Sequence, residues 1–149
     1  FISTTFGGEA LSLAGSLKTI EILSRPNSFK HIWKVSSKLS EDSIKIAKHK
    51  GLGDIVSMFG LPPHSGFIFK PRGKISSLDI LAVYQQKLLM NGILSVGINN
   101  FCLATNMKDV DKHLYAIDQA LDDIKKALER DSIKGIVKGR RITPIFKRN

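Results

Sequence analysis

The sequence has little of what marks specialised classes of protein. Its 149 residues include one cysteine, Cys102, so an internal disulfide framework is excluded. Lys, Glu or Asp interrupts the apolar segments, and no uninterrupted apolar stretch approaches the roughly 20 residues that cross a bilayer. Collagen-like repeats and low-complexity tracts are absent. The remaining composition, 42% hydrophobic and 24% charged, is typical of a globular domain that is long enough for one core.

Two further absences set the expected compartment and chemistry. There is no charged and then apolar leader, and one cysteine suits a reducing environment, so we expect a cytoplasmic protein that contacts no membrane. The histidines are scattered, and no cysteine or carboxylate pair has metal-ligand spacing, which predicts no metal site. Cys102 lies in an apolar segment without an adjacent base, so we expect a buried structural thiol in a strand and not a nucleophile.

Positive charge is abundant but unevenly spread. The net charge is +10, from 23 Lys and Arg against 13 Asp and Glu. The excess lies in residues 25–50 and in residues 132–149. This distribution predicts a solvated helix face and a loose basic tail. The alternative is a stand-alone module that binds nucleic acid or an acidic partner through the tail, with an affinity that falls steeply with salt.

Apolar periodicity predicts two helices in the first third of the chain. The first, over residues 9–24, is expected to be mostly buried. The second begins at a Ser28 cap after Pro26 and runs to about residue 50. The positions expected on their core faces are Ala10, Leu13, Ala14, Leu17 and Ile20 in the first helix, and Phe29, Ile32, Trp33, Ser36, Leu39 and Ile46 in the second.

Two more helices are predicted from helix-start boxes. Ser76 with Asp79 begins a helix that ends near residue 91, and Asn106 with Asp109 begins the last one. The positions expected to be buried are Ile80, Leu81, Tyr84 and Leu88 in the third helix, and Val110, Leu114, Ile117, Leu121, Ile124 and Leu128 in the fourth.

Short segments rich in β-formers lie between the helices. Residues 54–59 and 66–70 are predicted strands, and the two prolines between them indicate a turn or a crossover. Two further short strands are expected near residues 93–96 and 101–104. The order of elements predicts an α+β fold, a small, largely antiparallel sheet with helices packed on one face.

One segment suggests chemistry. Ser3-Thr4-Thr5-Phe6-Gly7-Gly8-Glu9 places hydroxyl residues and glycines directly before the first predicted helix. Hydroxyl groups and unpaired backbone N–H groups at a helix N-terminus can bind a phosphate, because the donors and the helix dipole point at the anion. The alternative for Thr5 is an ordinary helix cap.

The same segment carries a family resemblance. Residues 1–21 resemble the part of class III pyridoxal-phosphate (PLP)-dependent aminotransferases that reads Ser-Thr-Phe-Gly-Gly-Asn. Glu9, where many members have Asn, is similar to the branch that contains glutamate-1-semialdehyde aminomutase. Looser similarity covers residues 88–97 and 104–111 and reaches about residue 130.

The resemblance implies a role for each part of the chain. Residues 1–25 would be the end of the large PLP-binding domain and a linking helix, residues 26–131 the C-terminal small domain of a fold-type I PLP-dependent transferase, and residues 132–149 a basic tail. Thr5 would donate to the phosphate of PLP held mainly by the other subunit of a homodimer. Thr4 is a weaker candidate and Ser3 another, and Gly7 and Gly8 would let the backbone approach the cofactor.

The family's catalytic residues do not map onto this chain. The lysine that forms the Schiff base with PLP lies upstream of the motif in this family, so no catalytic residue is assigned here and the isolated chain is expected to be inactive. The arginine that many members use to hold a substrate carboxylate is also missing, since residues 97–101 read Gly-Ile-Asn-Asn-Phe. The resemblance thus implies amino-group transfer between a small-molecule amino donor and a carbonyl acceptor, with neither compound identified.

Overall fold

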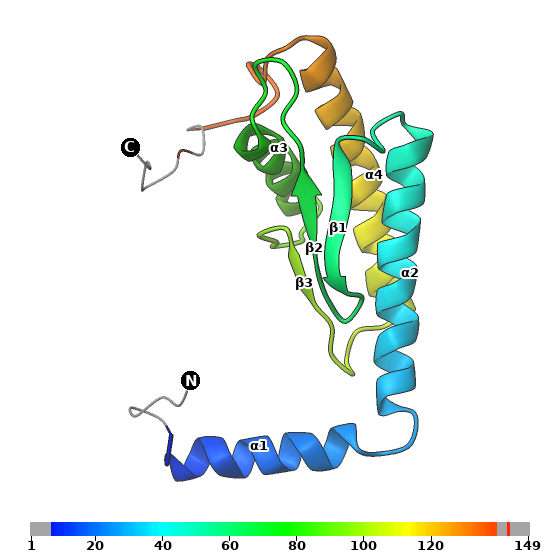
Figure 1. The fold of residues 1–149 in the computed structure, drawn as a ribbon, viewed down its shortest axis with the longest axis vertical. Helices are drawn as coiled ribbons and strands as arrows, with labels where there is room; N and C mark the ends of the chain where they lie inside the picture. The colour runs from blue at the N-terminus through cyan, green and yellow to red at the C-terminus, as the bar shows by residue number, and fades with distance from the viewer. Residues whose placement is uncertain (1–6, 140–142, 144–149) are drawn as a thin grey trace.

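Three short strands form one antiparallel sheet, with helices packed against it (Figure 1). The structure is a computed structural model that describes residues 7–139 and residue 143. In chain order the elements are α1 (Ala10–Leu23), α2 (Ser28–His49), β1 (Val56–Leu61), β2 (His64–Phe69), α3 (Ser77–Met90), β3 (Ile98–Asn100) and α4 (Met107–Glu129).

The first two strands form a tight hairpin. They pair from Val56 with Phe69 to Leu61 with His64, so the two prolines between them make a turn and not a crossover. Pro62 and Pro63 suit this turn, because proline has no N–H to donate within a sheet but is common in turns. The predicted strands at residues 54–59 and 66–70 are confirmed, each displaced by about two residues.

The predicted strands at residues 93–96 and 101–104 are wrong. One short strand, β3, lies between them and pairs with β2. Pairing begins only at Gly97, whose carbonyl oxygen accepts from Phe67 N at 2.9 Å and whose φ of +86° suits glycine. After β3 the chain turns, with Thr105 N donating to Cys102 O at 3.1 Å, and enters α4.

The two faces of the sheet differ in burial. Val56, Phe67 and Phe69 point to the inner face, where the two phenylalanine rings pack against Tyr84 of α3 at centroid distances of 5.1 and 5.3 Å. Ile68 and Ile98 point to the outer face and are exposed. No described element covers the outer face, so the predicted α+β fold, with helices on one face of a small antiparallel sheet, is confirmed.

Helices α3 and α4 begin at the predicted helix-start boxes. Asp79 N donates to Ser76 Oγ at 3.2 Å, and Ser76 N donates to the Asp79 carboxylate at 2.9 Å. Asn106 and Asp109 exchange the same two bonds at 2.9 and 3.3 Å. Each box satisfies backbone donors that the first helical turn leaves without partners, which fixes where the helix starts.

The predicted core faces of α3 and α4 are confirmed. Tyr84 and Leu88 of α3 are fully buried, and so are Ile117 and Ile124 of α4. The other predicted positions of these two helices are buried or half-buried against the same core; they are Ile80, Leu81, Val110, Leu114, Leu121 and Leu128. Lys50, at the end of α2, lies 3.0 Å from Asp118 and 2.5 Å from Asp122, so ion pairs also join α2 to α4.

Helix α2 departs from the prediction at its start. The residue before it is Asn27, which has a φ of +72° and makes no side-chain cap, while Ser28 lies inside the helix and donates to Ile22 O at 3.0 Å. Ser28 is therefore not the cap. Phe29 and Trp33, expected on the core face, are 57% and 41% exposed, because the sheet ends before it reaches this part of α2.

The prediction that α1 is mostly buried is wrong. Leu11 is 80% exposed and Leu17 is 70% exposed, and no residue of the helix is buried. The turn at residues 24–27 sends α1 away from the body at a steep angle to α2 (Figure 1). Its apolar residues therefore meet no described element over most of their surface.

Part of the predicted loose tail is anchored. Ile133, Ile136 and Val137 pack against the core. Gln86 of α3 donates from Nε2 to Ile136 O at 2.7 Å and accepts from Lys138 N at 2.6 Å. One side chain therefore holds two backbone groups of the segment after α4. All basic residues beyond residue 139 lie outside the described residues; they are Arg140, Arg141, Lys147 and Arg148.

Candidate functional site

The predicted phosphate-binding motif lies only partly within the described residues. Ser3, Thr4 and Thr5 are outside them. Gly7 and Gly8 form an exposed turn directly before α1. A Cβ built on Gly8 would meet no heavy atom of the described residues within 4 Å. A ligand could approach the backbone of this turn, as the sequence predicts for the two glycines.

Glu9 caps the N-terminus of α1, where the sequence predicts a bound phosphate. Its carboxylate accepts from Leu11 N at 2.9 Å and from Ser12 N at 2.6 Å. Hydrogen bonds from Ser12 and Leu11 hold the pKa of the Glu9 carboxyl below its usual value. Two donors at the helix N-terminus, Leu11 N and Ser12 N, are thus already paired and are not free for a phosphate. Because Glu9 is the cap, Thr5 is not needed to cap α1.

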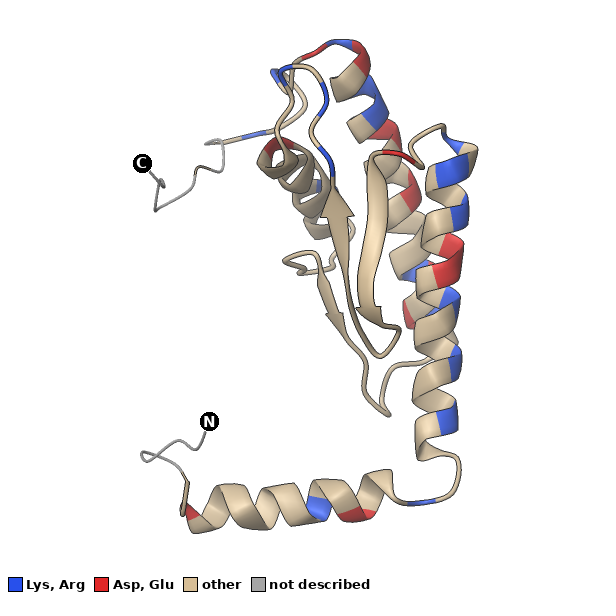
Figure 2. Ribbon diagram, in the orientation of Figure 1, with Lys and Arg blue, Asp and Glu red and all other residues tan. Residues whose placement is uncertain are grey.

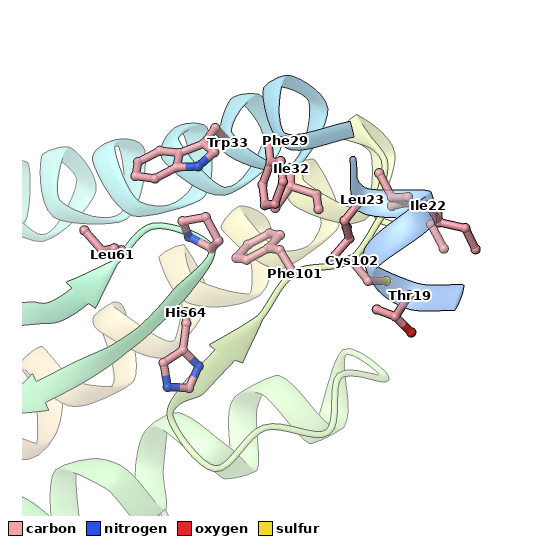
Figure 3. Close-up of a pocket in the computed structure, with 13 residues that line it drawn as sticks. Thr19, Ile22, Leu23, Phe29, Ile32, Trp33, Leu61, His64, Phe101 and Cys102 are labelled. Atoms are coloured by element: carbon pink, nitrogen blue, oxygen red, sulfur yellow. The ribbon is translucent and has the colours of Figure 1, made fainter. Parts of the chain in front are cut away.

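A large apolar groove lies between α1 and the body of the molecule. It has a volume of about 750 Å³, and Figure 3 shows side chains from α1, the start of α2, the hairpin and residues 101–104 around it. Its walls include Leu23, Phe29 and Phe101, and its few polar members include Thr19 and His64. A concave apolar surface with few polar groups is typical of a binding site. Sequence reasoning missed this groove because it is built from four separate segments.

Cys102 lies on the rim of this groove and is exposed, so the prediction of a buried strand thiol is wrong. The residue follows β3 in the turn that leads to α4. Cys102 N donates to Thr105 Oγ1 at 3.4 Å, and the Cys102 sulfur lies 3.7 Å from the same oxygen. The hydrogen bond with Thr105 lowers the pKa of the Cys102 thiol.

A hydrogen-bonded pair stands on the outer sheet face. His64 of β2 pairs with Asn100 of β3 in the sheet register, and His64 Nδ1 lies 2.5 Å from Asn100 Oδ1. Both residues are exposed. The next row of the same face holds Phe59, Gly66 and Ile98. The pair is thus a polar spot on a largely apolar surface.

A second polar spot is buried behind β3. The side-chain nitrogen Nδ2 of Asn99 and Nε2 of His113 are buried and have no hydrogen-bond partner among the described residues. Both residues line a small cavity of about 210 Å³ next to Ser95. Burial lowers the pKa of the His113 imidazole to about 4, which keeps it neutral near pH 7.

Exposed lysines follow one side of α2 (Figure 2), among them Lys30, Lys34 and Lys48. Two others are paired within the helix, since Asp42 lies 2.7 Å from Lys38 and 2.9 Å from Lys45. The predicted solvated helix face is present, and part of its charge is balanced locally.

The described residues contain neither a group of metal-binding side chains nor a helix that could cross a membrane. No three His, Cys, Asp or Glu side chains in residues 7–139 gather closely enough to hold a metal ion. In the same part of the chain no helix has the length and apolar character needed to cross a membrane.

Comparison with known proteins identifies the fold. No protein-family model matches the chain. A transaminase with PLP bound is 18% identical and superposes with a TM-score of 0.60, covering 72% of this chain and 25% of its own. The PLP internal aldimine form of the FumI protein from Sphingopyxis sp. MTA144 is 15% identical with a TM-score of 0.65, covering 87% of this chain and 30% of its own.

The chain therefore has the fold of one portion of these larger proteins, and it spans less than a third of either. The match agrees with the predicted fold class. It includes the small antiparallel sheet and its helices, which are most of the described structure.

Proposed function

We propose that this chain is the C-terminal part of a class III PLP-dependent aminotransferase or aminomutase, from the branch similar to glutamate-1-semialdehyde aminomutase. The whole enzyme would move an amino group between a small-molecule donor and a carbonyl acceptor in the cytoplasm. The catalytic lysine would lie in the missing part, so this chain alone is inactive. The fold similarity to a PLP-bound transaminase supports the proposal, as does the Ser-Thr-Thr-Phe-Gly-Gly motif.

The main observation in favour of a larger parent enzyme is the uncovered apolar surface beside α1. An isolated helix of 14 residues is marginal in water, and most helices in proteins depend on packing of an apolar face. Among the described residues, Leu11, Leu13, Leu17 and Ile20 are more than half exposed, and the groove of about 750 Å³ beside Thr19, Ile22 and Leu23 adds further uncovered apolar surface. Each structural neighbour has more than twice as much chain outside the matched part as within it.

Thr5 is the residue proposed to contact the cofactor, with Thr4, Gly7 and Gly8 beside it. When bound, PLP would supply the electron sink for amino-group transfer. This chain would contribute only to its binding, through the Thr5 hydroxyl and backbone N–H on the phosphate of a partner subunit in a homodimer. The space around Gly8 among the described residues fits this role. Glu9 caps α1, so Thr5 is not required as its cap.

Cofactor retention by the intact enzyme tests the assignment. We expect Thr5→Ala to weaken PLP binding by on the order of tenfold, since it removes a hydrogen bond to a charged group. The matched control is Ser16→Ala, which removes an exposed hydroxyl of α1 that does not line the groove. PLP titration followed by its visible absorbance gives both affinities. Equal affinities for Thr5→Ala and the control would count against the phosphate contact.

The predicted inactivity has its own test. The 149-residue chain is mixed with PLP, reduced with borohydride and digested, and the labelled lysines are identified by mass spectrometry. We expect weak labelling spread over surface lysines, because no lysine here is proposed for the Schiff base. Stoichiometric labelling of one lysine would overturn that part of the proposal. Intact mass of the protein from its native source would show whether a longer chain exists.

The exposed lysines of α2 favour a second candidate function, binding of nucleic acid or an acidic partner. Lys30, Lys34 and Lys48 have no carboxylate within ion-pair distance among the described residues. Such binding would weaken steeply as salt rises. A gel-shift series with DNA and RNA at increasing salt, with and without residues 132–149, would detect it.

A further inference from the structure

The outer face of the sheet holds an aromatic platform. Phe59 of β1 faces Gly66 of β2 in the register. A Cβ on Gly66 would lie 2.5 Å from Phe59 Cε1 and 2.7 Å from Phe59 Cζ, so the ring lies across the glycine against the sheet. Phe59 is nonetheless 45% exposed, which leaves part of the ring available to a ligand.

The hydrogen-bonding pair of His64 and Asn100 stands next to this platform. His64 precedes Gly66 by two residues, so it shares its face and lies roughly 7 Å along the strand. When Asn100 Oδ1 accepts across the 2.5 Å contact, His64 Nδ1 is the donor and carries the hydrogen. In neutral His64 the other nitrogen, Nε2, is then an acceptor, and the Asn100 amide offers N–H donors.

This combination suits a hydroxyl group and not a carboxylate. A hydroxyl can donate to His64 Nε2 and accept from the Asn100 amide, whereas a carboxylate only accepts. The outer-face positions of the three strands also include no charged residue; they are Ser57, Phe59, Leu61, His64, Gly66, Ile68, Ile98 and Asn100. No lysine or arginine stands at these positions to balance a carboxylate. Direct cover by apolar protein would leave the pair's polar atoms unsatisfied, at a cost that a ligand with hydroxyls avoids.

We propose that Phe59, His64 and Asn100 bind one uncharged sugar ring. The C–H face of the sugar stacks on Phe59, whose ring face carries negative charge density, and two sugar hydroxyls bond to His64 and Asn100. His64 also borders the groove of about 750 Å³. Binding of the sugar depends only on this face. If the proposed function holds, the bound sugar would carry the carbonyl group of the acceptor, and that step rests on the proposed function.

The binding test uses the full 149-residue chain and no PLP. Glucose is the neutral probe and acetate the carboxylate probe, each titrated to the same concentration while NMR follows the ring signals of His64 and Phe59. We expect saturable shifts with glucose in the millimolar range and none with acetate. The variants Phe59→Ala and Asn100→Ala should each weaken glucose binding at least fivefold. Tyr115→Ala is the matched control, because Tyr115 is an exposed aromatic residue on α4 that lies outside the groove, and it should bind as the unchanged chain does.

Three results would overturn the site: no saturable shift with glucose, equal shifts with acetate, or unchanged binding by Phe59→Ala. None of them bears on the cofactor, which is tested at Thr5 in the intact enzyme. Conversely, loss of the cofactor proposal leaves the sugar site standing as a binding site. The two proposals can therefore fail separately.

Discussion

The Phe59 ring on β1 fills the space that a side chain at position 66 of β2 would need. A Cβ there would come within 2.5 Å of the ring and 3.0 Å of Gly97 O. We expect Gly66→Ala to push the ring off the sheet and to lower the free energy of unfolding by about 1–3 kcal/mol. Urea denaturation measures the loss. Gly15→Ala, which meets nothing within 4 Å, is the control and should lose no stability.

The Tyr84 hydroxyl predicts a stabilising substitution. Tyr84 is fully buried between Phe67 and Phe69, and its oxygen has no partner among the described residues. Burial raises the pKa of Tyr84, which keeps the hydroxyl neutral. We expect Tyr84→Phe to raise the free energy of unfolding by about 1 kcal/mol, because it removes an unsatisfied polar group and keeps the ring. Tyr115→Phe, at an exposed position, should change nothing. A clear loss in Tyr84→Phe would mean that the hydroxyl is bonded.

His113 makes stability depend on pH. Burial lowers its pKa from the ordinary 6.5 to about 4, so below pH 6.5 the unfolded chain takes up a proton that the folded chain refuses. Stability contributed by the neutral ring is therefore complete above pH 6.5 and is lost as the pH falls toward 4, by up to about 3 kcal/mol. The free energy of unfolding, measured by denaturation at each pH in this range, should depend less on pH in His113→Gln. His49→Gln, at an exposed histidine, should keep the slope of the unchanged chain.

Gln86 predicts how firmly the segment after α4 is held. Its side chain makes both hydrogen bonds to Ile136 and Lys138, so Gln86→Ala removes both and leaves the half-buried Ile136 carbonyl and the exposed Lys138 N–H without these partners. We expect a loss of about 1–3 kcal/mol and faster hydrogen exchange at the Lys138 amide. Gln85→Ala, one residue earlier on the same helix, makes neither bond and should exchange at the original rate. Equal exchange in both variants would show that the apolar contacts hold the segment alone.

Local sequence signals predicted the elements whose boundaries depend on neighbouring residues. The boxes at Ser76 and Asn106 fix α3 and α4 because both partners lie within one helical turn. The prolines at residues 62–63 likewise confine the hairpin turn. For α1 the apolar pattern was present but could not say which body covers it, and in the described structure none does over most of its length. Strand β3 is three residues long, too short for a periodic pattern.

The candidate sites followed the same division. The exposed turn at Gly7 and Gly8 was predictable from glycine alone. Glu9 was assigned to a family pattern, yet its carboxylate caps the helix, which is a contact between backbone and side chain that several side chains could make. The outer-face pair joins His64 to Asn100 across a register that only the folded sheet defines. Cys102 was misplaced because its turn depends on Thr105 and on the start of α4.

The two-residue connection between β1 and β2 sets an order of assembly. Contacts within this hairpin are local, whereas β3 joins β2 through residues 36 apart, after α3 has been formed and closed over the core. During folding the hydrogen-bonding edge of β2 is therefore left open for a time beside exposed Phe59 and Ile68. An open edge next to apolar side chains is a template for pairing between chains. The yield of refolded monomer should fall as the protein concentration rises, even under conditions in which the folded chain stays dispersed.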